Sequence, residues 1–334
     1  METAGKQIID QFGRVHDYLR ISLTERCNLR CFYCMPEEGI ALRPRSVFMN
    51  KKEIVEVAKT FVSLGVNKIR LTGGEPLVRS DVREIIQALS QLPVDLAITT
   101  NGVLVDNFID TFKSVGLKSI NVSLDSLQKE KSNRITRREY FDKIMSNINL
   151  LIKNNFHVKL NAVIIRDVND DELIDFIEFT KYNNVHFRFI EFMPFDGNKW
   201  DWQKGVSFKE IMNTIDLKYS NSVLRLADRK NDTAKNFMIK DYFGTFAVIS
   251  SVSNPFCDTC NRIRLTADGK IKNCLFSNSE TDILSALRKG KDIQHLILET
   301  INNKKSFRGG MNTFEQLSDS AQRNKNRTMV AIGG

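Results

Sequence analysis

Residues 18–34 read YLRISLTERCNLRCFYC, a β-rich run that leads directly into a loop with Cys27, Cys31 and Cys34. An amphipathic segment follows at residues 51–64, where apolar side chains recur at intervals of three and four, as on a helix with one buried face. A strand, a polar loop and a helix in this order form the repeating unit of α/β proteins. The stretch therefore predicts a parallel sheet whose first strand ends in a cysteine loop.

The same order of elements recurs up to about residue 194. We expect strands at residues 18–24, 68–72, 95–100, 119–125, 158–165 and 186–192, and helices at residues 51–64, 80–89, 104–115, 140–154 and 170–182. Six such units are fewer than the eight of a closed barrel. The fold class that we predict is α/β, an incomplete (β/α)6 TIM-like barrel with its polar loops at the carboxyl ends of the strands.

The pattern changes beyond about residue 195. We expect a helix at 207–216, irregular chain at 220–242, strands at 245–250 and 263–267, a hairpin turn at Asp268-Gly269, helices at 281–289 and 293–302, and a mobile polar stretch at 303–327. This change predicts two domains. Residues 1–217 form the partial barrel with an N-terminal extension, and residues 218–334 form a smaller C-terminal α+β region.

The composition is that of a globular protein, with 42% hydrophobic and 27% charged residues. Neither a signal peptide nor a membrane-spanning apolar run is evident in the sequence, so we expect a cytoplasmic protein without a membrane partner. A solvated basic surface and an anionic ligand explain the net charge of +9 equally well. The basic residues beside the motifs are dispersed, which favours a small phosphorylated ligand over nucleic acid.

The six cysteines form two triplets, Cys27-x3-Cys31-x2-Cys34 and Cys257-x2-Cys260-x13-Cys274. Three thiolates leave one coordination position of a metal centre open for chemistry. For the first triplet the spacing favours a [4Fe–4S] cluster, with another metal or incidental thiols as alternatives. For the second, spacing alone favours a zinc knuckle, but no histidine lies between residues 187 and 294 to complete four ligands. That missing ligand is an argument for a second [4Fe–4S] cluster.

Directly after Cys260, the run Asn261-Arg-Ile-Arg-Leu265 has arginines at alternate positions. On a strand, Arg262 and Arg264 project to the same side. Two neighbouring guanidinium groups favour a bound anion such as a polyphosphate. A pair of surface arginines on an edge strand is the alternative.

These motifs resemble the radical S-adenosylmethionine (SAM) superfamily, in which a C-x3-C-x-aromatic-C loop follows the first barrel strand. Tyr33 occupies the aromatic position, and Gly73-Gly74-Glu75-Pro76 after the second strand is similar to the superfamily's motif for the methionine amino group. The resemblance implies that the first cluster and SAM together generate a 5′-deoxyadenosyl radical.

Nearly the whole chain is similar to the GTP 3′,8-cyclase family of molybdenum cofactor biosynthesis. The most specific marks are CNLRCFYCMP at residues 27–36, RLTGGEPL at 70–77, FCDTCNRIRL at 256–265 and RTMVAIGG at 327–334. The resemblance implies hydrogen abstraction at the ribose C3′ of GTP, bond formation to guanine C8, an external electron donor, and a second cluster that holds the guanine. It implies no side chain as a catalytic acid or base.

The resemblance also assigns site residues. Those expected at the SAM site are Tyr33, Gly74, Ser123 and Met193, and those expected to contact GTP are Arg20, Arg70, Thr99, Lys159, Arg262, Ile263 and Arg264. Buried cations inside a barrel need an anion, and a triphosphate supplies one. Internal ion pairs of Arg20, Arg70 and Lys159 with Glu75, Asp125 or Glu191 are the alternative. The tail Gly333-Gly334 is expected to reach into the active site.

Other readings of the same motifs are weaker. A radical SAM peptide maturase with one auxiliary cluster is the main alternative. A tRNA-modifying radical SAM enzyme would carry an RNA-binding module, and a non-catalytic metal-binding regulator would have closed four-ligand sites; neither feature is visible in the sequence. A homodimer is left open.

Overall fold

The computed structural model describes residues 7–36, 38–41, 43–198, 200–319, 321 and 326–333. Its centre is a 12-stranded sheet in the order β12-β11-β10-β1-β2-β3-β4-β5-β6-β9-β8-β7. The strands are β1 (Tyr18–Ser22), β2 (Lys68–Thr72), β3 (Asp95–Thr100), β4 (Ser119–Ser123), β5 (His157–Ile164), β6 (His186–Glu191), β7 (Val223–Arg225), β8 (Lys235–Ile239), β9 (Thr245–Ile249), β10 (Arg262–Leu265), β11 (Lys270–Lys272) and β12 (Thr281–Asp282).

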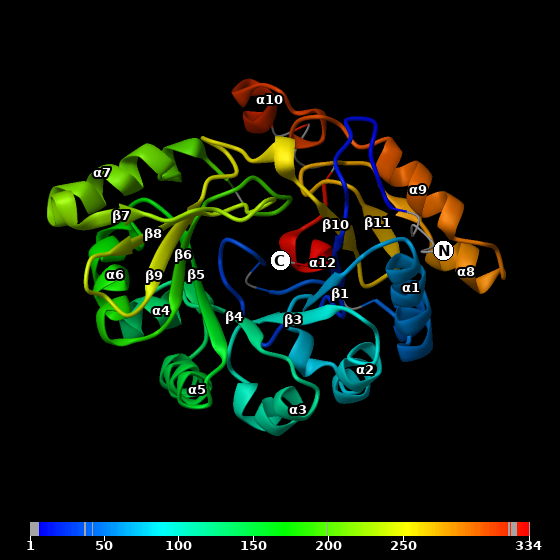
Figure 1. Cartoon of the computed structure of the whole chain (residues 1–334), viewed down its shortest axis with the longest axis horizontal. Helices are drawn as coiled ribbons and strands as arrows, with labels where there is room; N and C mark the ends of the chain where they lie inside the picture. Colours follow the sequence, from blue (N-terminus) through cyan, green and yellow to red (C-terminus); the bar gives the residue numbers. More distant parts are fainter. Residues whose placement is uncertain are drawn as a thin grey trace, which may run out of the picture.

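The helices connect and cover these strands. They are α1 (Lys51–Ser63), α2 (Val82–Leu89), α3 (Ile109–Ser114), α4 (Lys129–Thr136), α5 (Phe141–Lys153), α6 (Leu173–Tyr182), α7 (Phe208–Tyr219), α8 (Leu284–Arg288), α9 (Gln294–Asn302), α10 (Phe314–Ser318) and α12 (Met329–Ile332). Figure 1 shows α1 to α6 on the outer side of the curved sheet and α12 inside the curve. The predicted incomplete barrel is confirmed, because the sheet is curved but not closed.

The first six strands follow the expected pattern. Each neighbouring pair from β10 through β1 to β6 and on to β9 is parallel. Side chains on the outer face of the sheet, such as Leu19, Phe187 and Phe189, pack in one apolar core with the inner stripe of the helices, such as Phe61 of α1. Helix α1 begins with a capping box, in which the Asn50 side chain accepts from the Glu53 amide and the Glu53 carboxylate accepts from the Asn50 amide.

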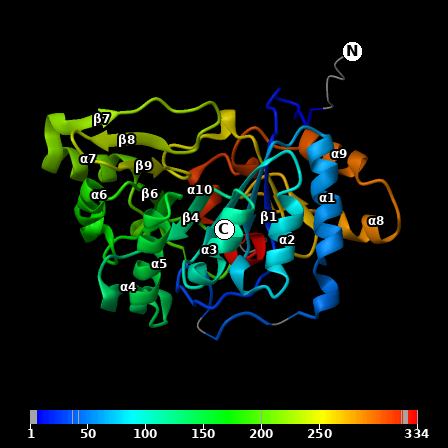
Figure 2. The ribbon, with the colours of Figure 1, turned by 60° about the horizontal axis from the view of Figure 1, so that its bottom comes forward.

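The C-terminal part of the chain extends this same sheet at both ends. Strand β9 pairs in parallel with β6, and β8 and β7 continue the sheet with antiparallel pairs. At the other end β10 pairs in parallel with β1, and β11 and β12 follow as antiparallel strands. Figure 2 shows β7 and β8 at the opposite end of the molecule from α8 and α9. The division near residue 217 stays a prediction, because both parts contribute strands to one sheet.

Some sequence-based expectations were wrong. Residues 220–242, expected to be irregular, contain the paired strands β7 and β8. Helix α4 was not expected, because its residues are mostly polar. The polar stretch 303–327 contains α10, which begins with a capping box at Thr313.

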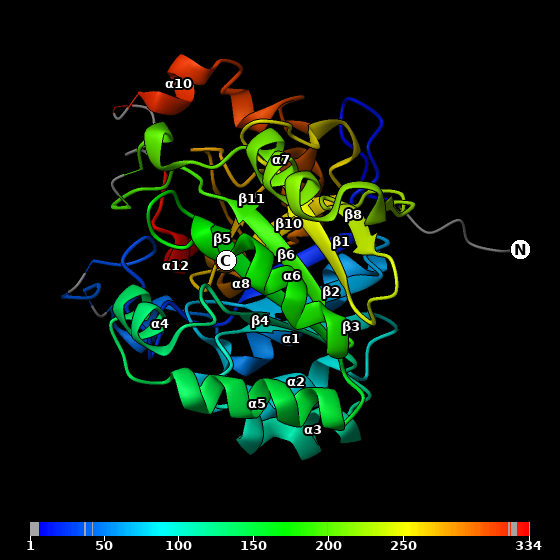
Figure 3. The same cartoon turned by 90° about the vertical axis from the view of Figure 1, so that its left-hand side faces the viewer.

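Figure 3 shows α5, α6 and α7 covering the β5–β6 side of the sheet. In the ranges that the structure describes, no helix has the length and apolar character needed to span a bilayer.

Candidate active site

The first cysteine loop lies against the loop that follows β2. The Gly74 amide donates to the Thr24 carbonyl at 2.7 Å, and the Glu75 amide donates to the Arg26 carbonyl at 2.8 Å. A Cβ atom on Gly74 would lie 2.5 Å from the Arg26 carbonyl oxygen, so a larger residue would push the loops apart. The Gly-Gly-Glu-Pro motif therefore sets the position of the cysteine loop.

The three cysteines of the first triplet are half-buried, and their thiols influence one another. Burial, and then the Glu75 carboxylate, raise the pKa of Cys27 to about 11. Burial, and then Cys27 and Asp125, raise the pKa of Cys34 to about 12. Burial also raises the pKa of Cys31, with added effects of Asp125, Cys34 and Cys27. Since this setting disfavours bare thiolates, a group that binds them must bring positive charge, as iron does.

The donor set fits a [4Fe–4S] cluster better than a single ion. Among the residues that the structure describes, no three Cys, His, Asp or Glu side chains converge where one metal ion would sit. A four-iron cluster needs no such point, because each thiolate binds a different iron at its own corner. Cys27 Sγ also accepts hydrogen bonds from the Leu29 amide at 3.4 Å and the Asn101 side chain at 3.8 Å, as cluster sulfurs commonly do.

The predicted SAM-site residues lie at the carboxyl ends of strands or in the loops that follow them. Gly74 lies just beyond β2, and Ser123 is the last residue of β4. Tyr33 donates its hydroxyl hydrogen to Asp125 Oδ2 at 2.7 Å. Tyr33 and Met193 both pack against a small apolar cluster that includes Phe192, and Cys274 of the second triplet packs there too. The structure thus brings Tyr33 of the first cysteine loop and Cys274 of the second triplet to one apolar cluster.

The second triplet is assembled by the β10–β11 hairpin. Cys257 lies in a short 3-10 helix, Cys260 directly precedes the loop into β10, and Cys274 follows β11. Burial raises the pKa of Cys257 and of Cys274. Burial also acts to raise the pKa of Cys260, but the charges of Lys304 and Arg262 outweigh it and lower that pKa to about 7. The second triplet therefore has a cationic setting, whereas carboxylates lie near the first.

Basic side chains of three adjacent strands form one row on the inner face. In register, Arg20 of β1 lies beside Arg70 of β2 and beside Arg264 of β10. Two residues earlier on β1, Tyr18 lies beside Lys68 of β2 and Arg262 of β10. Ile263, between the two arginines of β10, buries its side chain in the outer core, so any contact to GTP would come from its main chain.

Burial and neighbouring cations lower the pKa values of Lys159, Arg188 and Arg264. Burial, and then Arg188 and Arg70, lower the pKa of Lys159 to about 8. Burial, and then Arg70, lower the pKa of Arg188 to about 9, and burial and then Arg262 lower that of Arg264 to about 10. Such repulsion between desolvated cations is relieved by a polyanion. We call the inner face of the sheet around Arg70, Lys159, Arg188 and Arg264 the chamber.

The acceptors that these cations use are neutral. Arg70 donates to the Tyr18 hydroxyl at 2.6 Å and the Ile98 carbonyl at 2.9 Å. Arg188 donates to Asn161 Oδ1 at 2.8 Å, and Arg262 donates to Thr233 Oγ1 at 3.0 Å. The charges therefore stay available to a ligand.

The carboxylates that might have paired with Arg70 or Lys159 have other partners. Glu75 accepts from the Asn101 amide at 2.6 Å, Asp125 from the Val163 amide at 2.9 Å, and Glu191 from the Val252 amide at 2.7 Å. No ion pair of Arg70 or Lys159 with these three carboxylates occurs within the described ranges. The alternative of internal ion pairs therefore receives no support for Arg70 and Lys159.

Two buried polar atoms beside Lys159 lack a hydrogen-bond partner in the described part of the chain, Thr99 Oγ1 and Asn121 Oδ1. In register, Thr99 of β3 lies beside Asn121 of β4, which lies beside Lys159 of β5. Unsatisfied buried polar atoms are rare and costly, so their clustering here indicates a place for a polar ligand. Sequence reasoning included Thr99 and Lys159 but missed Asn121.

The C-terminal tail enters the same chamber. The Arg264 guanidinium donates to the Gly333 carbonyl at 2.9 Å. A Cβ atom on Gly333, whose φ is +87°, would lie 2.7 Å from Thr72 Oγ1 and 2.8 Å from Ser22 Cβ. Gly333 is thus wedged between β1 and β2, as expected for the tail. Gly334 lies outside the described residues.

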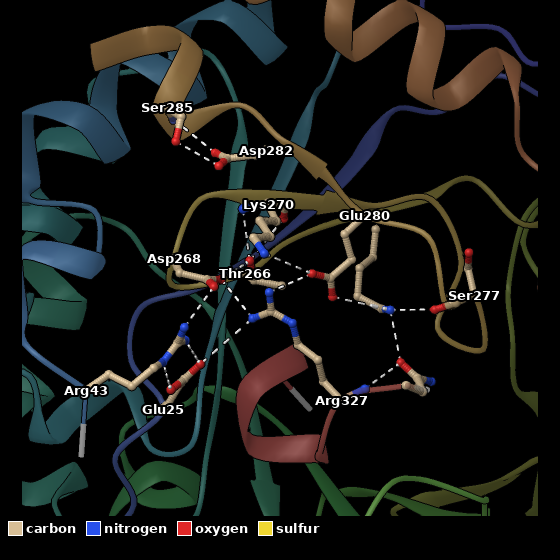
Figure 4. A network of polar contacts seen from close by, with 12 residues as sticks. Glu25, Arg43, Thr266, Asp268, Lys270, Ser277, Glu280, Asp282, Ser285 and Arg327 are labelled. Carbon is tan, nitrogen blue, oxygen red and sulfur yellow. Dashed lines mark hydrogen bonds and ion pairs between the residues drawn. The ribbon is translucent and has the colours of Figure 1, made fainter. Parts of the chain in front are cut away.

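A network of polar contacts fixes the start of the tail (Figure 4). Arg327 donates to Asp268 Oδ1 at 2.9 Å and to Glu280 Oε2 at 2.6 Å. Asp268 also accepts from Arg43 at 3.1 Å, and Arg43 pairs with Glu25 of the first cysteine loop. The tail, the β10–β11 hairpin and the first cysteine loop are therefore joined through charged side chains.

Comparisons with known proteins place this architecture in a class. The Radical SAM superfamily profile matches residues 21–180, and the Molybdenum Cofactor Synthesis C profile matches residues 185–308. The chain is a radical SAM protein, and that membership implies SAM and one [4Fe–4S] cluster.

Full-length similarity narrows the class to one family. The chain is 46% identical over 333 residues to "GTP 3',8-cyclase, mitochondrial" of Arabidopsis thaliana, covering 98% of this chain and 83% of the relative. It is 40% identical over 336 residues to "GTP 3',8-cyclase" of Listeria welshimeri, covering 97% of this chain and 98% of the relative. The chain belongs to the GTP 3′,8-cyclase family. It spans about half of the length of "Molybdenum cofactor biosynthesis protein 1" of Homo sapiens, to which it is 43% identical.

A solved structure supports the fold alone. The crystal structure of Streptococcus suis SuiB bound to S-adenosylmethionine has a TM-score of 0.62 at 15% identity, over 94% of this chain and 73% of SuiB. At this identity the likeness shows a shared barrel-like architecture and not a shared substrate.

Proposed function

We propose that this chain converts GTP to 3′,8-cyclo-GTP, an early step of molybdenum cofactor biosynthesis. When bound, the first [4Fe–4S] cluster and SAM would supply a 5′-deoxyadenosyl radical for removal of the ribose C3′ hydrogen. Bonding of C3′ to guanine C8 would leave one unpaired electron on the purine, and an electron from the external donor together with a proton would complete the product. Cys27, Cys31 and Cys34 would hold this cluster, and Tyr33, Gly74, Ser123 and Met193 would line the SAM site.

The observation that carries the proposal is the row of inner cations with neutral acceptors. Burial, Arg188 and Arg70 lower the pKa of Lys159, and burial and Arg70 lower that of Arg188. Within the described ranges, Arg70 and Arg188 donate to neutral acceptors. A triphosphate brings the compensating charge and accepts several charge-assisted hydrogen bonds at once. Arg20 and Arg264 lie in register with Arg70, and Arg262 lies two residues before Arg264 on the same strand; all three would share in this binding.

A second cluster on Cys257, Cys260 and Cys274 is part of the proposal. Three thiolates would leave one iron of the cluster open to the guanine. Thr99 and Asn121, whose buried oxygens lack partners in the described chain, would then contact the nucleoside between the two clusters.

The chain's own part in the reaction is positioning and exclusion of water. Gly333, held by Arg264, narrows the chamber beside β1 and β2. A closed chamber keeps a reactive radical from solvent and holds the ribose near the site of hydrogen removal. No side chain is assigned as a catalytic acid or base.

Anaerobic turnover tests the proposal. Reconstituted protein is incubated with SAM, a chemical reductant and GTP, and 5′-deoxyadenosine and 3′,8-cyclo-GTP are measured. We expect both products only when GTP is present, with ATP as the control nucleotide. About eight irons per chain, four for each cluster, are expected as well. Release of 5′-deoxyadenosine at the same rate without GTP would refute the assigned substrate, and a peptide substrate would then be tested.

The remaining assignments are proposals of the same kind. We propose a cytoplasmic protein that takes electrons from an external donor and binds neither nucleic acid nor a membrane. A homodimer and the division into domains of residues 1–217 and 218–334 are proposals as well. Salt-dependent retention on immobilised duplex DNA would contradict the proposal that the protein binds no nucleic acid, in which the basic residues of the chamber face a small ligand.

A further inference from the structure

Lys304, which follows α9, presents a buried cation to the second cysteine triplet. Lys304 is only 2% exposed to solvent. Its Nζ donates to Cys260 Sγ at 3.5 Å and to the Arg262 carbonyl at 3.2 Å. In the described part of the chain, no carboxylate lies within ion-pairing distance of Lys304. A buried ammonium without a counter-charge is costly, so an anionic centre at Cys260 would account for it.

The segment that carries Lys304 is held rigidly over the cysteines. Gln11 donates to the Lys304 carbonyl at 3.0 Å. Arg14 donates to the carbonyls of Cys257 at 2.8 Å and Lys305 at 2.9 Å. The N-terminal segment, distant in sequence, therefore ties the backbone at Lys304 and Lys305 to the backbone at Cys257, as groups that support a metal centre commonly do.

A backbone donor from the same segment reaches a second cysteine. The Arg308 amide donates to Cys257 Sγ at 3.4 Å. Residues 304–308 thus supply hydrogen bonds to two of the three sulfurs of the triplet.

The two triplets differ in this respect. In the described part of the chain, Cys27 of the first triplet accepts only from neutral groups, the Leu29 amide and the Asn101 side chain. Across the described ranges, Lys304 is the one charged side chain that donates a hydrogen bond to a cysteine sulfur. Hydrogen bonds to the sulfurs and nearby charge are two of the main influences on the reduction potential of a cluster.

We propose that Lys304 is a positioning residue that acts through Cys260 to raise the reduction potential of the second cluster. A cation beside the sulfur stabilises the reduced cluster, which carries one more negative charge. This inference rests on the proposed function, since that function supplies the second cluster. It assigns no step of the reaction to Lys304.

The test compares full-length, reconstituted Lys304→Met and Lys305→Met. Lys305 is adjacent but exposed, so K305M removes the same charge from the surface. Each protein is titrated with a chemical reductant and followed by electron paramagnetic resonance. The signal that SAM alters belongs to the first cluster, and the other signal belongs to the second.

We expect K304M to weaken one-electron reduction of the second cluster by at least about tenfold, which corresponds to about 59 mV. The first cluster should keep its midpoint in both variants, and K305M should match the wild type. A second-cluster midpoint in K304M equal to that in K305M overturns the inference.

Two further measurements separate the possible failures. If K304M binds only about four irons, the titration is repeated on Lys304→Gln, which keeps a donor without the charge. An unshifted midpoint in K304Q then overturns the inference. If the wild type itself holds only about four irons and shows a single signal, the proposed second cluster is wrong, which is a failure of the proposed function.

Discussion

The Gly333 carbonyl accepts a hydrogen bond from Arg264 at 2.9 Å, inside the curve of the sheet. The last described residue of the chain is thereby bound to one of the cations assigned to the substrate. Because Arg264 lies in register with Arg20 of β1, a change at the tail acts on the row of cations directly. The tail is thus part of the chamber wall.

Gly333→Ala should displace the tail. The added Cβ would lie 2.7 Å from Thr72 Oγ1 and 2.8 Å from Ser22 Cβ, in a backbone conformation with φ of +87°. We expect turnover of GTP to fall by about 100-fold, the order of loss that a misplacement of about 1 Å causes. Gly290→Ala is the matched control, because its φ is +66° and nothing lies within 4 Å of the added Cβ. Equal turnover in the two variants would show that the tail is dispensable.

The Glu75 carboxyl should give the ligand-free protein a characteristic pH dependence. Burial raises its pKa from 4.5 to about 7, although the Asn101, Leu77 and Thr100 donors oppose the shift. The folded state therefore holds a proton that the unfolded state has released between about pH 4.5 and pH 7. Stability should fall as pH rises through this window, by up to about 3 kcal/mol for this one group.

Glu75→Gln isolates this effect. The glutamine amide nitrogen cannot accept from the Asn101 amide, so the variant is less stable at every pH. The diagnostic quantity is the slope: between pH 4.5 and pH 7, the free energy of unfolding of E75Q minus that of the wild type should increase. Denaturant titrations under anaerobic conditions measure it. A difference that does not vary with pH would show that Glu75 titrates normally.

Arg188 shows what the sequence could and could not reveal. In β6, Phe187 and Phe189 are buried under α6, and the alternation leaves Arg188 on the inner face. The alternation of residues 187–189 could have identified Arg188, but the sequence motifs lie at the ends of the strands.

The strands β7 and β8 were missed for another reason. They complete an existing sheet at its edge, and edge pairing leaves little pattern in a mostly polar segment.

The sequence predicted well where local rules act. The six strand–helix units, the cysteine loop and the hairpin at Asp268 follow from periodicity and turn residues. The joining of both ends of the chain to one sheet does not, because it depends on pairing between segments distant in sequence, such as β10 with β1. Asn121 belongs to this second group, since only the register beside Lys159 reveals its role.

Arg188→Gln should weaken substrate binding while stabilising the ligand-free protein. Loss of one charge-assisted contact is expected to raise the KM for GTP by about tenfold. Without Arg188, the pKa of Lys159 should rise above its value of about 8, because burial and then Arg188 depress it. We expect the free energy of unfolding to rise by about 1 kcal/mol, since one pKa unit corresponds to about 1.4 kcal/mol.

Lys209→Gln serves as the control for charge, because Lys209 is exposed on α7. Steady-state kinetics and denaturant titration of both variants supply the measurements. If R188Q binds GTP as the wild type does, the anion lies elsewhere in the chamber.

Arg327 should govern how firmly the tail is docked. Burial acts to raise the pKa of Asp268, but Arg327 and Thr266 outweigh it and lower that pKa to about 2. A depressed carboxyl pKa stabilises the fold above the unfolded value of 3.8 and loses that effect as pH falls toward 2. At neutral pH the ion pairs of Arg327 with Asp268 and Glu280 are therefore fully formed.

Arg327→Gln leaves both carboxylates without this partner, at a cost of about 3 kcal/mol for a largely buried pair. We expect faster proteolysis of the tail and lower GTP turnover, with iron content unchanged, because Arg327 has no hydrogen bond to a cysteine sulfur within the described ranges. Lys270→Gln is the matched control, since Lys270 lies 3.9 Å from Glu280 and contacts it only weakly. If R327Q and K270Q are cleaved at the same rate, the tail is held by Gly333 and Arg264 alone, and the network in Figure 4 serves only the hairpin.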